Sequence, residues 1–179
     1  MSFEHKILKS IAKTRHDIFT KIMKFFSLSA NAGVIFFILS LIMILSEKYK
    51  KMGYACIVTV LTHSFICNVL LKPVIKRMRP FDRYQDIIVL LDKIPKDYSF
   101  PSGHTGASFA FATTVFLYDK KLGALAYILA LCIAYSRMYL GVHYPTDIIG
   151  GVILGSGIAI LIFYFFPLEK FLLMLKIVV

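Results

Sequence analysis

The segment 136–147, SRMYLGVHYPTD, holds an arginine, a histidine and an aspartate between two long apolar stretches. The guanidinium group of Arg137 is a planar fork of donors that suits phosphate oxygens. The neutral imidazole of His143 is able to attack phosphorus, and Asp147, four residues on, can hold the ring in the tautomer this requires. Charged groups beside lipid are costly and are rarely present without a function. The trio therefore predicts one half of a phosphoryl-transfer site.

The composition indicates an integral membrane protein. Of the 179 residues, 58% are hydrophobic and only 17% are charged, which is too apolar for a soluble domain of this size. The formal net charge of +11 suits anionic headgroups or phosphorylated substrates. It does not favour nucleic acid as a partner, because the charges flank apolar spans and form no soluble basic face. The three cysteines lack metal-ligand spacing, so we interpret them as packing residues.

Five stretches without Lys, Arg, Asp or Glu predict membrane-spanning helices, since a helix needs about 20 residues to cross the hydrocarbon core. They are 28–46, 53–71, 103–118, 122–136 and 148–168. We expect polar residues shielded by neighbouring helices to extend the short third and fourth stretches. The predicted fold class is an all-α integral membrane protein, a bundle of about five transmembrane helices within 28–168. The whole chain, 1–179, is then a single domain that crosses the plasma membrane several times.

The N-terminal segment 1–27 predicts an amphipathic helix lying in the membrane surface, because its apolar and basic residues fall largely on opposite faces. A soluble coiled-coil or partner-binding helix is the alternative. The tail, 169–179, is a shorter and weaker version of the same pattern. The apolar residues of the N-terminal helix are Ile7, Leu8, Ile11, Ile18, Phe19, Ile22 and Phe26, and the basic residues are Lys6, Lys9, Lys13, Lys21 and Lys24.

Five crossings bring the polar segments 72–101 and 137–147 to the same membrane face as the N-terminal helix. The short turns 47–52 and 119–121 then lie on the other face. The fifth span carries small residues that let helix backbones approach closely, which we interpret as a packing feature. These residues are Gly150, Gly151, Gly155 and Gly157.

Three clusters on the converging face resemble the signature motifs of the type 2 phosphatidic acid phosphatase family. The first is Lys72 followed after six residues by Arg79-Pro80, the second is Pro101-Ser102-Gly103-His104, and the third is Ser136-Arg137 with His143 and Asp147. No fixed position departs from the family pattern, and the order and spacing also match. The motifs cover 72–147, and the helical plan extends the likeness over nearly the whole chain.

The resemblance implies a role for each motif residue. Phosphate binding falls to Lys72, Arg79, Ser102, Gly103 and Arg137. We expect Pro101 to begin a helix, which would place the Gly103 N–H at a positive helix end where anions bind. No metal or other cofactor is implied, because cationic side chains take the place that magnesium has in many phosphoryl-transfer enzymes.

The catalytic roles that the resemblance implies fall to three side chains. His143 attacks phosphorus to form a phosphohistidine, and Asp147 orients its ring. His104 protonates the leaving oxygen and then activates the water that hydrolyses the intermediate.

Some polar and apolar residues near the motifs match no fixed position. We interpret the cations Lys76, Arg77 and Arg83 as surface charge that anchors the membrane edge. The segment 81–100 is too polar to span. Its apolar stretch 87–91 is either a dip into the membrane that shapes lipid access or a short packed helix.

The sequence therefore predicts metal-independent hydrolysis of a lipid phosphate or diphosphate, with membrane lipids as the other partners. The chain resembles undecaprenyl diphosphate and phosphatidylglycerophosphate phosphatases, with phosphatidic acid and lipid A 1-phosphate as further options. Vanadium haloperoxidases share the anion cage but are soluble. A non-catalytic membrane component that binds or transports a lipid or an anion is the alternative function. The oligomeric state is open.

Two considerations favour opposite orientations of the converging face in the membrane. The cations on the converging face favour a cytoplasmic position by the positive-inside tendency. Bacterial members of the family that the chain resembles commonly face outward. We expect the site on the outer face.

Overall fold

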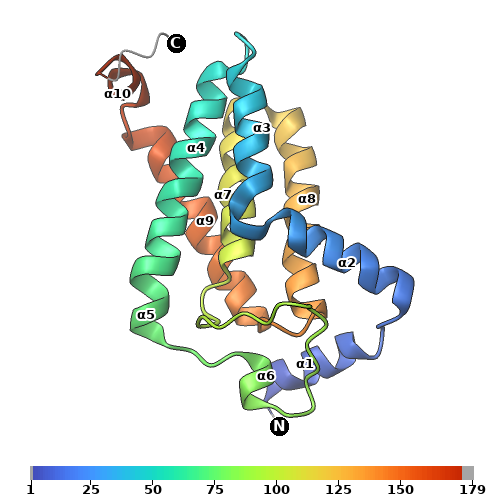
Figure 1. Ribbon diagram of the computed structural model, residues 1–179. Coiled ribbons are helices and arrows are strands. Elements are labelled where there is room, and N and C mark those ends of the chain that lie inside the picture. Colours follow the sequence, from blue (N-terminus) through green and yellow to red (C-terminus); the bar gives the residue numbers. More distant parts are fainter. Residues whose placement is uncertain (1, 175–179) are drawn as a thin grey trace.

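A computed structural model describes residues 2–174, and these residues form helices without any strand. Figure 1 shows the long helices running side by side, with α1 and α10 at opposite ends of the bundle. This confirms the predicted all-helical class. The α-helices are α1 (Phe3–Ala12), α2 (Asp17–Ser29), α3 (Val34–Ile44), α4 (Lys50–Phe65), α5 (Lys72–Ile75), α6 (Pro80–Arg83), α7 (Gly103–Tyr118), α8 (Lys120–Tyr139), α9 (Pro145–Phe165) and α10 (Leu168–Met174). A 3₁₀ turn, η1 (Asn31–Gly33), precedes α3, and a π-helical turn, η2 (Ile66–Leu71), joins α4 to α5.

Helices occupy all five predicted spans, but they differ in length. The segment Lys50–Arg83, α8 and α9 are each long and apolar enough to cross a membrane. Helices α2 and α3 pass the same test only as a pair bent by 60°. Helix α7 has 16 residues and is buried from Thr105 to Val115, so it is the central helix of the bundle. Its neighbours supply the surface that faces lipid.

The N-terminal segment forms two helices, which corrects the predicted single helix over 1–27. Helix α1 ends at Ala12, and Thr14 donates its hydroxyl to the Ile11 carbonyl at 2.7 Å. Helix α2 begins after His16, whose Nδ1 accepts from the Phe19 N–H at 3.4 Å. Between them, Arg15 donates to the carbonyl oxygens of Tyr139 and Ile88 on other parts of the protein. These hydrogen bonds of Arg15 to distant segments coincide with the break between α1 and α2. The local sequence pattern does not report them.

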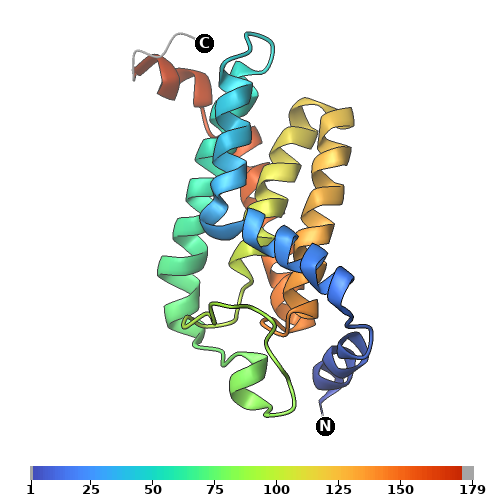
Figure 2. The same ribbon diagram turned by 45° about the vertical axis from the view of Figure 1, so that its right-hand side comes forward.

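The two N-terminal helices cover the end of the bundle at which α8 ends. Figure 2 shows α2 crossing the front of the bundle and α1 below it. Met23 of α2 is buried against Tyr139 and Leu140 at the end of α8. Ile18 remains 72% exposed on the same helix and is available to lipid. The predicted tail forms α10 as far as Met174, and its last residues, 175–179, lie outside the described residues.

Helices α7 and α9 pack closely because two glycines of α9 face the α7 backbone. A Cβ atom on Gly155 would lie 2.1 Å from the Gly106 carbonyl oxygen, and one on Gly151 would lie 2.8 Å from that of Ser102. A Cβ atom on Gly157 would meet no packing neighbour within 4 Å in the described part of the chain, so the predicted packing role does not extend to this glycine. The close approach brings the N-termini of α7 and α9 together, where the Ser102 N–H donates to the Asp147 carbonyl at 3.0 Å.

The loop between α6 and α7 closes the same end of the bundle. Its apolar stretch 87–91 has no regular secondary structure, so of the two alternatives for this stretch the short packed helix is wrong. Ile87 packs in a cluster with Leu8 and Tyr144, and the Leu90 N–H donates to the Leu140 carbonyl at 3.2 Å. These contacts with the protein take the place of the hydrogen bonds that a helix would supply.

Candidate active site

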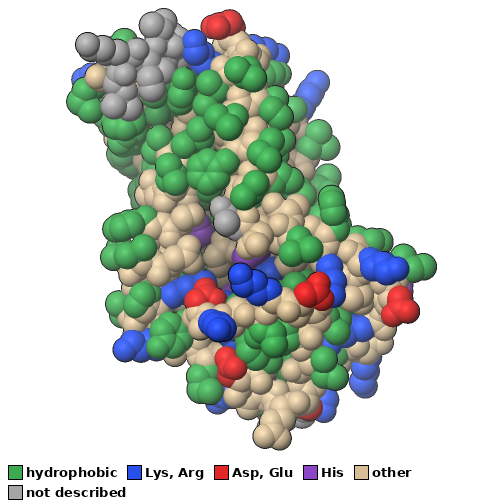
Figure 3. Space-filling view, in the orientation of Figure 1, with side chains coloured by type: hydrophobic (Ala, Val, Ile, Leu, Met, Phe, Trp, Pro, Cys, Tyr) green, Lys and Arg blue, Asp and Glu red, His purple; other side chains and the backbone are tan. Residues whose placement is uncertain are grey.

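A cavity of about 830 Å³ opens at the end of the bundle where the loops and the N-terminal helices meet. In Figure 3, charged side chains gather in the lower half of the molecule, and histidine side chains are visible in a hollow among them. Six of the eight site residues predicted from the sequence line this cavity, together with Lys24 and Ser27 of α2. The six are Lys72, Arg79, Gly103, His104, Arg137 and His143.

His143 lines this cavity and forms a buried pair with Asp147. The His143 Nδ1 lies 3.2 Å from Asp147 Oδ2, and its Nε2 lies 3.4 Å from a guanidinium nitrogen of Arg79. A guanidinium group can only donate, so Nε2 is the acceptor and Nδ1 carries the proton that faces Asp147. Burial, and then the nearby guanidinium groups, hold the pKa of His143 well below its ordinary value. The ring is therefore neutral and presents a lone pair at Nε2.

The local sequence places this pair at the start of α9. Pro145 occupies the first turn of the helix, where its missing N–H costs nothing, and Tyr144 precedes it as the cap. Asp147 Oδ2 accepts from the Tyr144 N–H at 2.9 Å, so the carboxylate caps the helix as well as facing the imidazole. Before His143, Gly141 adopts φ +80°, and a Cβ there would lie 2.7 Å from the Ile88 carbonyl. Glycine suits this sharp turn between α8 and α9.

Two of the predicted phosphate-binding cations are paired with a carboxylate that the sequence did not single out. Asp97 accepts from Lys72 Nζ through one oxygen and from Arg79 at 2.7 Å through the other. Lys72 and Arg79 are 6% and 3% exposed, whereas the Asp97 side chain is 51% exposed. Burial alone raises the pKa of Asp97, but the two cations outweigh it and hold the pKa well below its usual value. Asp97 is therefore an ionised carboxylate on the exposed side of the buried Lys72 and Arg79.

Arg137 is the third buried cation, and α2 supplies its partner. One guanidinium nitrogen donates to the hydroxyl of Ser27. The Arg137 Nε is buried without a hydrogen-bond partner among residues 2–174. A buried guanidinium with unused donors is suited to bind an anion that enters the cavity. Ser27 was not predicted, because its amphipathic helix gave no sign of reaching the site.

The Pro-Ser-Gly-His motif divides between capping a helix and lining the cavity. Helix α7 begins at Gly103, two residues after the predicted start at Pro101. Ser102 is fully buried, and its hydroxyl lies 2.9 Å from the Thr105 hydroxyl and accepts from the Thr105 N–H at 3.5 Å. Ser102 and Asp147 are the two predicted site residues that do not line the cavity. Gly103 and His104, in the first turn of α7, do.

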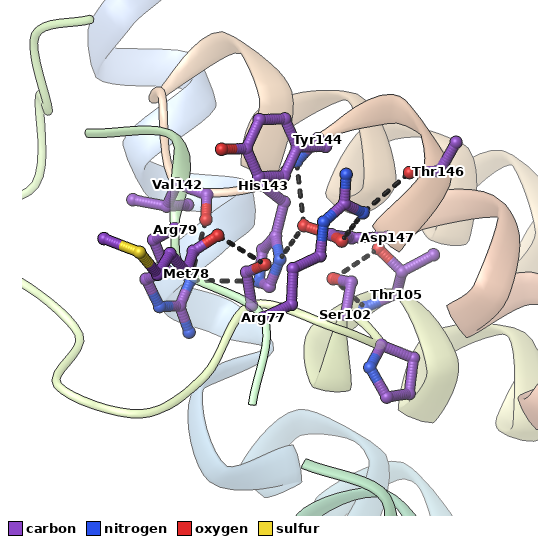
Figure 4. Close-up of polar contacts among 12 residues, drawn as sticks. Arg77, Met78, Arg79, Ser102, Thr105, Val142, His143, Tyr144, Thr146 and Asp147 are labelled. Atoms are coloured by element: carbon purple, nitrogen blue, oxygen red, sulfur yellow. Dashed lines mark hydrogen bonds and ion pairs between the residues drawn. The ribbon is translucent and has the colours of Figure 1, made fainter. Parts of the chain in front are cut away.

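Arg77 is part of the site, which corrects its interpretation as surface charge. Figure 4 shows its guanidinium group directed toward Asp147 and Thr146 at the start of α9. The same guanidinium group lies over the Tyr144 ring, with Cζ 4.1 Å from the ring centroid. Lys76 and Arg83 are exposed, as expected for surface charge. No group of three or more His, Cys, Asp or Glu side chains in the described part of the chain is arranged to hold a metal ion.

The comparisons with known proteins identify the family. Residues 53–171 match the PAP2 superfamily, and the chain belongs to it. It is 30% identical to lipid A 4'-phosphatase of Bacteroides thetaiotaomicron, over 83% of this chain and 76% of that protein. It is 34% identical to undecaprenyl-diphosphatase of Sulfolobus acidocaldarius over 67% of this chain, and spans 58% of that relative's length.

A solved structure shares the fold. The crystal structure of Aquifex aeolicus LpxE superimposes with a TM-score of 0.79 at 24% sequence identity. The match covers 90% of this chain and 94% of that one. At this identity the likeness concerns the arrangement of the helices, and it confirms the predicted transmembrane bundle.

Proposed function

We propose that this protein hydrolyses a membrane lipid phosphate or diphosphate through a phosphohistidine intermediate. The observation that carries the proposal is the His143–Asp147 pair at the wall of a cavity that also holds three buried cations. Such cations offset the charge that develops on phosphate oxygens in the transition state. A cavity at the end of a membrane bundle suits a substrate whose headgroup leaves the bilayer while its tail stays in it.

In the first step, the phosphate group occupies the cavity and displaces the Asp97 carboxylate from Lys72 and Arg79. The His143 Nε2 lone pair attacks phosphorus while Asp147 holds the Nδ1 proton. His104 donates a proton to the oxygen of the leaving lipid as the phosphorus–oxygen bond breaks. The products of this step are the lipid alcohol, or monophosphate, and the phosphohistidine.

In the second step, His104, now neutral, takes a proton from a water molecule that attacks the phosphohistidine. The phosphorus–nitrogen bond breaks, phosphate is released, and His143 returns to its neutral form. Lys72, Arg79 and Arg137 bind the phosphate oxygens throughout, with the Gly103 N–H at the positive end of α7. The Ser102 hydroxyl binds the same oxygens once it turns away from Thr105. The scheme uses these cations without a metal ion.

Undecaprenyl diphosphate is the leading substrate in this proposal. The name of the Sulfolobus relative, undecaprenyl-diphosphatase, supports this substrate. The name of the Bacteroides relative, lipid A 4'-phosphatase, supports lipid A as another candidate. Phosphatidylglycerophosphate is the next candidate, since the cation cluster recognises only the terminal phosphate and does not select the tail. A panel of these lipids, assayed for phosphate release by the purified protein, tests the proposal. Binding without release from any of them would instead support the non-catalytic alternative.

Two controls accompany the panel. His143→Ala should bind the lipid phosphate and release no phosphate above background. Excess EDTA should leave the rate of the intact enzyme unchanged, and a loss of rate restored only by magnesium would contradict the metal-free scheme.

We further propose that the cavity faces the outer side of the plasma membrane. The argument is the resemblance to bacterial family members, and it opposes the positive-inside tendency of this face. A single cysteine placed at Lys93, beside the cavity, or at Asp119, at the far end of the bundle, distinguishes the two orientations. In intact cells, an impermeant thiol reagent should label the cysteine at 93 and leave the one at 119 unlabelled.

A further inference from the structure

Arg77 connects the N-terminal helix α1 to the carboxylate that faces His143. One of its guanidinium nitrogens donates to Asp147 Oδ1 at 2.5 Å, and the other donates to Glu4 Oε2 at 2.7 Å. The second oxygen of Glu4 accepts from the Thr146 hydroxyl at 2.5 Å. A continuous chain of polar contacts thus runs from α1 through Arg77 to Asp147 and on to the imidazole of His143.

The burial of Asp147 makes this contact important. Its side chain is 0% exposed, and a buried carboxylate without a cation nearby tends to bind a proton. Arg77 is the residue whose cationic group forms an ion pair with it. A protonated Asp147 would donate to His143 Nδ1, which would leave the proton of the imidazole on Nε2. That tautomer has no lone pair to attack phosphorus.

Helix α1 is held in place independently of Glu4. His5 stacks on the Tyr84 ring with centroids 4.0 Å apart, and Asp86 accepts from His5 at 2.8 Å and Lys9 at 3.0 Å. Leu8 is buried against Ile87. Glu4 is therefore presented to Arg77 by a docked helix. The family match begins at residue 53, so Glu4 lies outside it and Arg77 lies inside.

We propose that Arg77 and Glu4 are positioning residues for the reaction, and that α1 is consequently part of the catalytic unit. The inference rests on the proposed function of His143 as the nucleophile. Arg77 keeps Asp147 ionised and fixes its direction, and Glu4 fixes the guanidinium group of Arg77. Neither residue lines the cavity, so they act on the chemical step and leave substrate binding unaffected.

The steady-state test uses the full chain in detergent micelles and the lipid of the panel that it hydrolyses fastest. Arg77→Gln should lower kcat about 100-fold at unchanged KM, because the imidazole is left in the wrong tautomer. Glu4→Gln should lower kcat about 5-fold, because Arg77 keeps its bond to Asp147. In the Arg77→Gln background, Glu4→Gln should have no further effect. Arg77→Lys should restore most of kcat and abolish the dependence on Glu4.

Matched controls are available for both charges. Arg83→Gln removes an exposed cation six residues from Arg77, and Glu47→Gln removes an acid whose side chain is 90% exposed at the far end of the bundle. Both should leave kcat unchanged. A kcat for Arg77→Gln equal to that of Arg83→Gln, in a protein that remains folded and monodisperse, would overturn the proposal.

A second measurement does not depend on turnover. In ¹⁵N-histidine-labelled protein, the His143 signals are assigned by their loss in His143→Ala. The intact protein should show the proton on Nδ1, and Arg77→Gln should move it to Nε2. Retention of the Nδ1 proton in Arg77→Gln would contradict the positioning role even if no lipid of the panel were hydrolysed. Failure of the panel with the predicted change of tautomer would instead reject only the proposed substrates or reaction.

Discussion

The two ends of the helical bundle each contain a cavity, and they differ in whether the charged side chains there are exposed or buried. At the far end, a cavity of about 500 Å³ lies among α4, α7, α9 and α10, where Lys51 and Glu169 form an ion pair at its rim. Their side chains are 44% and 68% exposed. At the end where we propose the active site, Lys72, Arg79 and Arg137 are almost completely buried. Water screens the first set of charges, whereas the second set needs an anion.

The difference indicates that the burial of the charged side chains, rather than their number, distinguishes the end at which we propose the active site. An exposed ion pair contributes little to stability and needs no ligand. A cluster of buried cations is costly, and the protein offsets part of the cost with Asp97 for Lys72 and Arg79. The remaining buried donors of Arg137 have no such carboxylate among the described residues. This end of the bundle is therefore suited to bind an anionic group.

The largest effect is expected from the nucleophile. His143→Ala should lower kcat by about 10³-fold or more, because no other group replaces the imidazole in the first step. Phosphate release measured with the fastest lipid of the panel provides the test. Turnover within tenfold of the intact enzyme would remove the basis for assigning chemistry to this end.

A somewhat smaller loss is expected from a buried cation. Arg79→Gln should lower kcat/KM by about 10²- to 10³-fold, since Arg79 binds phosphate oxygens and also faces His143. Unlike Arg77→Gln, it should raise KM as well as lower kcat. An unchanged KM would show that Arg79 acts on the imidazole alone.

In the proposed mechanism the substrate phosphate displaces the Asp97 carboxylate from Lys72 and Arg79. Neutralising Asp97 tests this competition. Asp97→Asn removes the carboxylate that competes for Lys72 and Arg79, so vanadate should inhibit about tenfold more tightly. The same variant should unfold at a lower temperature without vanadate, because two buried cations lose their partner. Weaker inhibition by vanadate would indicate that Asp97 holds the cations in the geometry that binds phosphate.

The smallest effect is expected at the far cavity. Lys51→Gln and Glu169→Gln should each change kcat/KM by less than about twofold and the free energy of unfolding by less than about 0.5 kcal/mol. Steady-state kinetics and thermal unfolding in detergent provide the measurements. A large loss of turnover in either variant would break the contrast between the two ends.

Helix positions and motif residues could be predicted from the sequence because both are local patterns. Uninterrupted apolar stretches locate the helices, and the fixed spacing of the motifs locates six of the residues that line the cavity. The contacts of Ser27, Asp97 and Glu4 depend on how distant segments pack, and no local pattern reports this. Arg77 and Arg83 look alike in the sequence, and only the position of the buried Asp147 carboxylate distinguishes them.

The central claim is that His143 becomes phosphorylated. A lipid phosphate carrying ³²P in its terminal phosphate, mixed with the protein and quenched within milliseconds, should leave acid-labile and base-stable label on the chain. The label should accumulate in His104→Ala if hydrolysis of the intermediate slows more than its formation, and it should be absent from His143→Ala. Label retained in His143→Ala, or turnover of the intact enzyme with no trapped phosphohistidine under any quench time, would contradict the account.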